Sequence, residues 1–138
     1  MSTRLLYRIA AVLILLFDVG HSVGCPWSDP AWGAAPDVMK SGHFRVFGFT
    51  RSYWDFYVGF GLFVSVFLLL AALLAWQLGS LPSQTRPLLR GTAWALTLSF
   101  AAVTVLSGMF FFTIPIVFSS VITVCLVAAA WRSGGTES

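Results

Sequence analysis

The stretch LFVSVFLLLAALLAW, residues 62–76, contains neither a charge nor a proline. Backbone amide and carbonyl groups cannot stay unpaired in lipid, so an apolar run of this kind crosses a membrane as a helix. A strand of a membrane barrel would alternate polar and apolar side chains, and this stretch does not. With its flanks the run covers residues 53–78, which exceeds the roughly 20 helical residues needed to span about 30 Å of hydrocarbon.

The composition of the whole chain also indicates a lipid environment. Of its 138 residues, 58% are hydrophobic and 9% are charged, whereas a soluble domain carries about 25% charged residues. The length suits one domain, and we predict a single membrane domain, residues 1–138. The net charge of +3 is spread along the chain without a basic block, so no nucleic-acid partner is expected.

Three further apolar runs are long enough to span a membrane. One covers residues 5–24, and two share residues 92–131, a block without a charge. This block must turn once, and GMFFFTIP, residues 108–115, is the predicted turn, with Thr113 as the N-cap and Pro115 in the first turn of the next helix. We therefore predict an all-α integral membrane four-helix bundle with helices at residues 5–24, 53–78, 92–110 and 113–131.

The placement of basic residues predicts the orientation. If the N-terminus is cytoplasmic, the cytoplasmic side holds Arg4, Arg8, Arg86, Arg90 and Arg132, and the outer side holds Lys40, Arg45 and Arg51. This bias favours cytoplasmic N and C termini, one long outer loop at residues 25–52, and a multi-pass protein of the bacterial cytoplasmic (inner) membrane. Aromatic belts are expected at the inner interface from Tyr7, Trp76, Trp94 and Trp131, and at the outer interface from Trp27, Tyr53 and Trp54.

The first apolar run has a second interpretation. MSTRLLYRIAAVLILL, residues 1–16, resembles a signal peptide, and SVGC, residues 22–25, resembles a lipoprotein cleavage site. Asp18 and His21 interrupt the region before that site, so we expect an uncleaved membrane span. Cys25 and Cys125 fall at different depths, and no disulfide between them is expected. Whether Cys25 is free, paired between chains or modified stays open.

The outer loop changes character along its length. Its first half is rich in proline and glycine and is not expected to be helical. Its second half interleaves Phe44, Phe47 and Phe49 with Lys40, His43, Arg45 and Arg51, a mixture that suits the lipid headgroup layer. The loop is interpreted either as a lid lying on the membrane over a cavity or as a segment anchored at the interface.

Polar residues near the outer ends of two helices form the candidate site. Asp18 and His21, in FDVGHSVG, are three residues apart and share a helix face, and Asp55 is expected at the level of His21 or slightly above it. A charged carboxylate in hydrocarbon is costly, so it normally faces the bundle interior. Gly20, Gly24 and Gly59 would let the helices approach closely or leave room for a ligand. Further ligand-binding candidates are Phe47, Trp54, Gly59, Thr104, Ser107 and Thr113. The opposite end of the bundle is expected to be chemically inert.

Three interpretations of this polar layer stay open. The preferred one is an outward-facing pocket for a lipophilic small molecule (a quinone, an isoprenoid or a lipid-like compound), with Asp18, His21 and Asp55 as acid–base groups if chemistry occurs. The second is a structural or accessory membrane subunit whose polar layer only fixes helix packing. The third is proton or ion translocation, which would need polar residues through the whole membrane. Expected partners are membrane lipid and the lipophilic molecule, and a homo-oligomer or a larger membrane complex stays open.

Metal binding is not expected. Asp18, His21, His43 and Asp55 are of the types that ligate zinc, but two histidines are too few for the histidine-rich di-iron membrane enzymes. The sequence has no glycine-rich phosphate loop and no nucleophile elbow, so no cofactor is assigned.

SYWDFYVGFGLF, residues 52–63, with the apolar run that follows and ends in AWQLG, resembles a stretch shared by small, uncharacterised bacterial four-helix membrane proteins. In size and layout the chain is also similar to DoxX-like proteins. The resemblance covers the second predicted helix and otherwise only the architecture. It implies a four-helix membrane fold and carries over no functional residue.

The predicted orientation can be tested by labelling in intact cells. In a chain whose Cys25 and Cys125 are changed to serine, S41C should react with an impermeant thiol reagent and S83C should not, because the two positions lie on opposite sides of the membrane. Labelling of S83C from outside would reverse the orientation.

Overall fold

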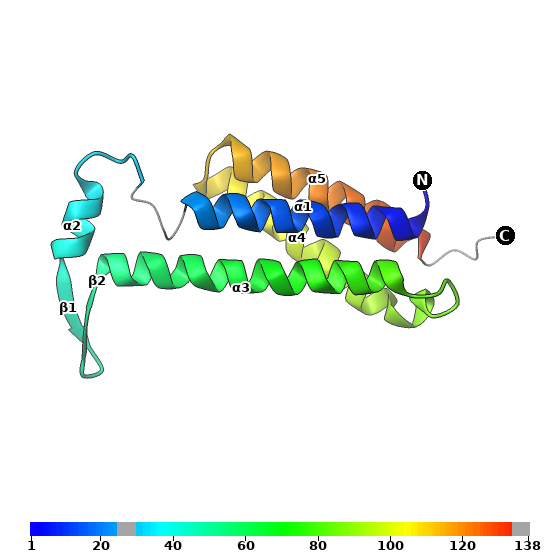
Figure 1. Cartoon of the computed structure of the whole chain (residues 1–138), viewed down its shortest axis with the longest axis horizontal. Helices are drawn as coiled ribbons and strands as arrows, with labels where there is room; N and C mark the ends of the chain where they lie inside the picture. Colours follow the sequence, from blue (N-terminus) through cyan, green and yellow to red (C-terminus); the bar gives the residue numbers. More distant parts are fainter. Residues whose placement is uncertain (25–29, 134–138) are drawn as a thin grey trace. The chain divides into compact units, whose positions relative to one another are not determined.

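A computed structural model describes residues 1–24 and 30–133 of the chain, which is mostly helical (Figure 1). Its four long helices are α1 (Thr3–Gly24), α3 (Tyr53–Ser80), α4 (Arg90–Phe110) and α5 (Thr113–Arg132), and a short 3-10 helix, η1 (Arg86–Leu89), precedes α4. All four, with η1 counted into the third, are long and apolar enough to cross a membrane. Their bounds agree with the predicted spans to within two residues.

The described chain divides into two compact units. Unit 1 comprises Met1–Phe17 and Leu69–Ser138, and unit 2 comprises Asp18–Leu68. The helices α1 and α3 contribute residues to both units. The single membrane domain, residues 1–138, stays a prediction.

Unit 1 is a helical bundle to which all four long helices contribute. The helices α4 and α5 pack against each other as a hairpin (Figure 1). Alanine is frequent in the core, and small side chains let helix backbones approach closely. Its buried apolar residues include Ala10, Ala11, Ile14, Ala72, Ala75, Leu96, Phe100, Ile122, Leu126, Ala129 and Ala130.

The turn between α4 and α5 lies where the sequence predicted it, but its cap differs. The backbone is extended at Phe111 and Phe112, and Phe112 is the N-cap residue of α5, with no side-chain hydrogen bond. The prediction that Thr113 caps the helix is wrong by one residue, because Thr113 is already helical and its hydroxyl lies beyond the capping position. Pro115 lies in the first turn of α5, as predicted.

Unit 2 contains the described part of the loop that was predicted to lie outside. It forms a short helix, α2 (Ala35–Ser41), and an antiparallel hairpin of β1 (His43–Val46) and β2 (Phe49–Ser52). The hairpin is a departure from the all-α prediction. Helix α2 corrects the expectation that the first half of the loop is not helical: Pro36 lies in its first turn, where a missing N–H costs nothing. Cys25, Trp27 and Asp29 lie outside the described residues.

Gly79 of α3 lies close to α1 within unit 1. A Cβ atom at this position would lie 3.1 Å from Cβ of Tyr7 and 3.2 Å from the backbone oxygen of Arg4. Both atoms belong to the rigid part of α1, so neither can move away without shifting the helix.

We therefore expect Gly79→Ala to lower the free energy of unfolding by about 1 kcal/mol or more, because overpacking costs about 1–3 kcal/mol. Gly91→Ala is the matched control: a Cβ atom there meets nothing within 4 Å, and alanine favours the helix. Thermal unfolding in detergent measures both variants, and equal stability of the two would contradict the close approach.

Candidate functional site

Asp18 is the buried carboxylate of unit 2. The residue is 7% exposed, and within residues 1–24 and 30–133 its Oδ1 atom has no hydrogen-bond partner. A buried polar atom without a partner is uncommon and costs about 1–3 kcal/mol. The cost is one that a purely structural residue would normally avoid.

His21 is held by the backbone of α3. Its Nε2 atom lies 3.0 Å from the carbonyl oxygen of Gly61. A carbonyl oxygen can only accept, so Nε2 carries the proton and donates. On the neutral ring Nδ1 is then unprotonated and can accept a hydrogen bond or a proton.

A second hydrogen bond lies next to the first. The hydroxyl of Ser22 is 2.9 Å from the hydroxyl of Ser65, and Gly61 and Ser65 are one helical turn apart on α3. We call these four residues the α1–α3 clamp. Within unit 2, the clamp joins two consecutive residues of α1 to one turn of α3.

Asp55 has a local role that the sequence analysis missed. Its Oδ2 atom accepts a hydrogen bond of 2.7 Å from the amide of Ser52, and its own amide donates to the Ser52 hydroxyl at 3.1 Å. This reciprocal pair is a capping box that starts α3. Asp55 precedes Gly61, the partner of His21, by six residues, or about 9 Å along the helix axis. The structure therefore pairs Asp55 with Ser52, and it pairs His21 with Gly61.

The glycines predicted to permit close helix approach do not do so. Among the described residues, a Cβ atom at Gly20, Gly24 or Gly59 would meet nothing within 4 Å, so within this part of the chain the close-approach prediction is wrong. The alternative, that they leave space beside the helices, agrees with this geometry.

Trp54 has neighbours within unit 2: Nζ of Lys40 lies 4.7 Å from its ring centroid and the Tyr57 ring lies 5.1 Å away.

The three hydroxyl candidates of α4 and α5 belong to unit 1. Thr104 donates to the carbonyl oxygen of Phe100 at 2.9 Å and lies 3.1 Å from the hydroxyl of Thr123, so it contributes to the packing of α4 on α5. Ser107 is buried, and Thr113 is exposed. The predicted site residues are thus distributed over both units.

Unit 1 contains buried polar groups where the sequence analysis expected an inert end. Tyr7 is 1% exposed, and its hydroxyl lies 3.2 Å from that of Ser133. Ser133 donates to the carbonyl oxygen of Ala129 at 2.8 Å, so Tyr7 is the donor of the pair. Tyr7 is therefore a core residue, which corrects its assignment to an aromatic belt. The Nε atoms of Arg8 and Arg86 are buried and have no partner among the described residues.

No three His, Cys, Asp or Glu side chains gather into a metal-ligand set in the described ranges 1–24 and 30–133. His43 has a local partner, because its Nδ1 atom donates to the carbonyl oxygen of Ser41 at 2.8 Å. The four residues considered as zinc ligands do not form such a set.

No protein-family model, curated protein or solved structure matches the chain. The resemblance to small bacterial four-helix membrane proteins stays a prediction.

The α1–α3 clamp can be measured with a double-mutant cycle. Hydrogen bonds between membrane helices average about 0.6 kcal/mol, so Ser22→Ala and Ser65→Ala should be coupled by about that amount in the free energy of unfolding. Pairing Ser22→Ala with Ser99→Ala supplies the control, because Ser99 donates to its own helix at the carbonyl oxygen of Ala95. Equal coupling in both cycles would argue against a specific clamp.

Proposed function

We propose that the chain is a multi-pass protein of the bacterial inner membrane that binds a lipophilic small molecule through Asp18. The observation that carries this proposal is the Oδ1 atom of Asp18, buried and without a partner in the described chain. Buried polar atoms are normally hydrogen-bonded, and an exception often has a functional reason. A ligand group that hydrogen-bonds to Oδ1 would remove the cost.

The chemistry of a carboxyl group limits the ligand. As a carboxylate, Asp18 only accepts hydrogen bonds, so it would bind the hydroxyl of a quinol, an isoprenoid alcohol or a lipid. As a protonated acid it can also donate, for example to a quinone oxygen. The rest of the ligand should be apolar, because Asp18 belongs to a helix that is apolar enough to cross a membrane.

His21 is the residue best placed to assist Asp18. The two residues are three positions apart on one helix face, and the hydrogen bond to Gly61 fixes the imidazole with Nδ1 as its acceptor. An acid–base step would therefore use Asp18 and His21. Asp55, which caps α3, is left out of this proposal.

A structural or accessory subunit is the second candidate. The observation that favours it is the α1–α3 clamp, in which His21 and Ser22 already have partners on α3. This function explains the clamp fully, but it gives no reason for a buried, unpartnered oxygen on Asp18.

The proposed orientation has both termini in the cytoplasm. Within unit 1, Arg132 near the end of α5 donates a hydrogen bond to the backbone oxygen of Met1. The start of α1 and the end of α5 therefore lie together, which supports an even number of crossings. The excess of arginine predicted for the cytoplasmic side supports the direction.

The proposal predicts opposite effects on stability and on binding. Asp18→Leu should raise the free energy of unfolding of the ligand-free chain by about 1 kcal/mol, because it removes a buried unsatisfied oxygen. The same variant should lose a discrete lipophilic molecule that co-purifies from native membranes with the parent chain, as detected by mass spectrometry.

Ser52→Ala is the control for general destabilisation. It removes one half of the capping box and should cost about 1 kcal/mol while the molecule is retained. If the parent chain carries only bulk phospholipid, or if Asp18→Leu is destabilising, the structural candidate replaces the binding protein.

A further inference from the structure

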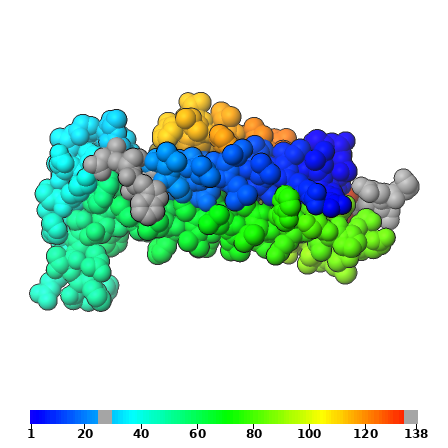
Figure 2. Space-filling view, viewed as in Figure 1, coloured from blue at the N-terminus to red at the C-terminus, as the bar shows by residue number. Residues whose placement is uncertain are grey.

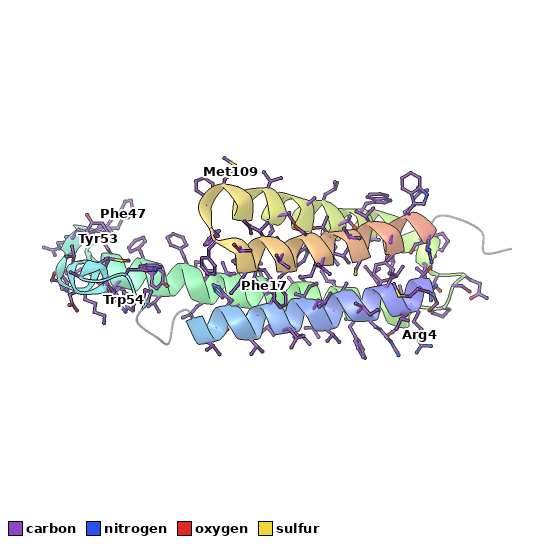
Figure 3. The ribbon with its side chains drawn as sticks, turned by 90° about the horizontal axis from the view of Figure 1, so that it is seen from above. Arg4, Phe17, Phe47, Tyr53, Trp54 and Met109 are labelled. Carbon is purple, nitrogen blue, oxygen red and sulfur yellow. The ribbon has the colours of Figure 1, made fainter. Side chains whose placement is uncertain are left out.

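The hairpin of β1 and β2 ends in an unusual turn. Its two central residues, Phe47 and Gly48, both have left-handed backbones, with φ values of 46° and 86°. This is the pattern of a type I′ turn, in which Asn-Gly is strongly preferred. A phenylalanine in this conformation is strained. Its side chain gains nothing from the rest of the described chain, because it is 98% exposed and points away from the strands (Figure 3).

The register of the hairpin places its apolar strand residues on one face, together with Arg51. Cross-strand partners share a face of the sheet, and the pairs Phe44↔Arg51 and Val46↔Phe49 make one face. The other face consists of His43, Arg45, Thr50 and Ser52. The hairpin is therefore amphipathic, and Phe49 on its apolar face is 62% exposed.

Contacts within unit 2 fix the hairpin to the start of α3. The Phe44 ring lies 5.1 Å from Tyr53 and 5.4 Å from Phe56, and the Tyr53 ring lies 3.0 Å from where a Cβ atom of Gly42 would be. Strand β2 runs directly into α3, and the hairpin extends sideways from this end of the helix (Figure 1). Four strand residues span about 13 Å, so Phe47 is held well away from the helix. In Figure 2 the hairpin tip protrudes from unit 2.

The charges of the hairpin itself are positive. Residues 43–52 contain Arg45 and Arg51 and no acidic residue, and the nearest carboxylates along the chain are Asp37 and Asp55. The Arg51 guanidinium lies 5.3 Å from the centroid of the Phe49 ring, so a cation accompanies an exposed aromatic side chain. A positive charge next to exposed phenyl rings is the combination that binds an anionic lipid surface.

We propose that the hairpin docks on the lipid leaflet where α3 enters the membrane. Phe47 and Phe49 enter the acyl boundary, and Arg51, on the same face as Phe49, binds anionic headgroups. Continuity with α3 supports a lipid surface as the occupant, because the apolar span starts at Tyr53 and holds the hairpin at headgroup depth. A row of rings continues from Phe44 through Phe56 to Phe60, 61% exposed, along the same helix.

The test compares tryptic cleavage after Arg45 and Arg51 in the full chain, with one copy per lipid nanodisc. Phe47→Asn installs the favoured turn dipeptide, so in detergent without lipid it should slow cleavage by stabilising the hairpin. In discs containing phosphatidylglycerol it should instead speed cleavage roughly tenfold. The reason is that the binding free energy lost with a buried phenyl ring corresponds to a factor of about ten or more. Leu88→Asn is the control: Leu88 is 83% exposed in η1, and its change should leave both cleavage rates unaltered.

Two further comparisons vary the charge of the lipid and the number of protein copies in each disc. The parent hairpin should be less protected in purely zwitterionic discs, by about fivefold for each basic residue engaged. The difference in protection between anionic and zwitterionic discs should vanish at about 1 M salt, where the Debye length is about 3 Å. Slower cleavage of Phe47→Asn in discs as well as in detergent would overturn the proposal. Protection that appears only in discs with two copies would overturn it in favour of a second chain as the partner.

Discussion

The rule that no backbone hydrogen-bonding group stays unpaired in lipid governs this chain. It requires helices for the apolar runs, and it also affects the side chains. Several hydroxyl groups of α4 and α5 donate to carbonyl oxygens of their own helix, as Thr97 does to Ala93 and Thr123 to Ser119. Such groups are satisfied without any partner helix. A polar side chain that is not satisfied in this way, such as Asp18, is therefore informative.

The α1–α3 clamp and Asp18 are the two polar features of unit 2, and they differ in whether their polar atoms have partners. In the α1–α3 clamp, His21 and Ser22 have partners on α3, so the clamp can contribute to stability. The Oδ1 atom of Asp18 has no partner in the described chain and lowers stability. Features that cost stability are expected at sites of function rather than at sites of packing. The unpartnered atom of Asp18 therefore favours the binding protein, and the clamp favours the structural subunit. Both features lie in the same turn of α1.

The sequence predicted the features that depend on long apolar runs. It did not predict those that depend on a few neighbouring residues or on residues far apart in the chain. The four spans were predicted to within two residues because apolar length dominates them. The role of Asp55 was missed because S-x-x-D at the start of α3 was interpreted as part of the polar layer of Asp18 and His21 instead of a cap. The hairpin was missed because Phe-Gly is not a usual turn signal. The Tyr7–Ser133 hydrogen bond joins residues 126 positions apart, and no local pattern announces such a pair.

The unequal lengths of the helices affect how the chain fits a bilayer. Helix α3 has 28 residues and α5 has 20, which at 1.5 Å per residue correspond to about 42 Å and about 30 Å. A hydrocarbon layer of about 30 Å matches α5. It also matches the apolar run of α3 at residues 56–76, which at 1.5 Å per residue is about 32 Å long. The surplus length of α3 therefore lies in its ends, which carry Asp55 and Gln77. These ends should reach into the headgroup layers, so α3 can meet polar groups of the lipid where α5 has already ended.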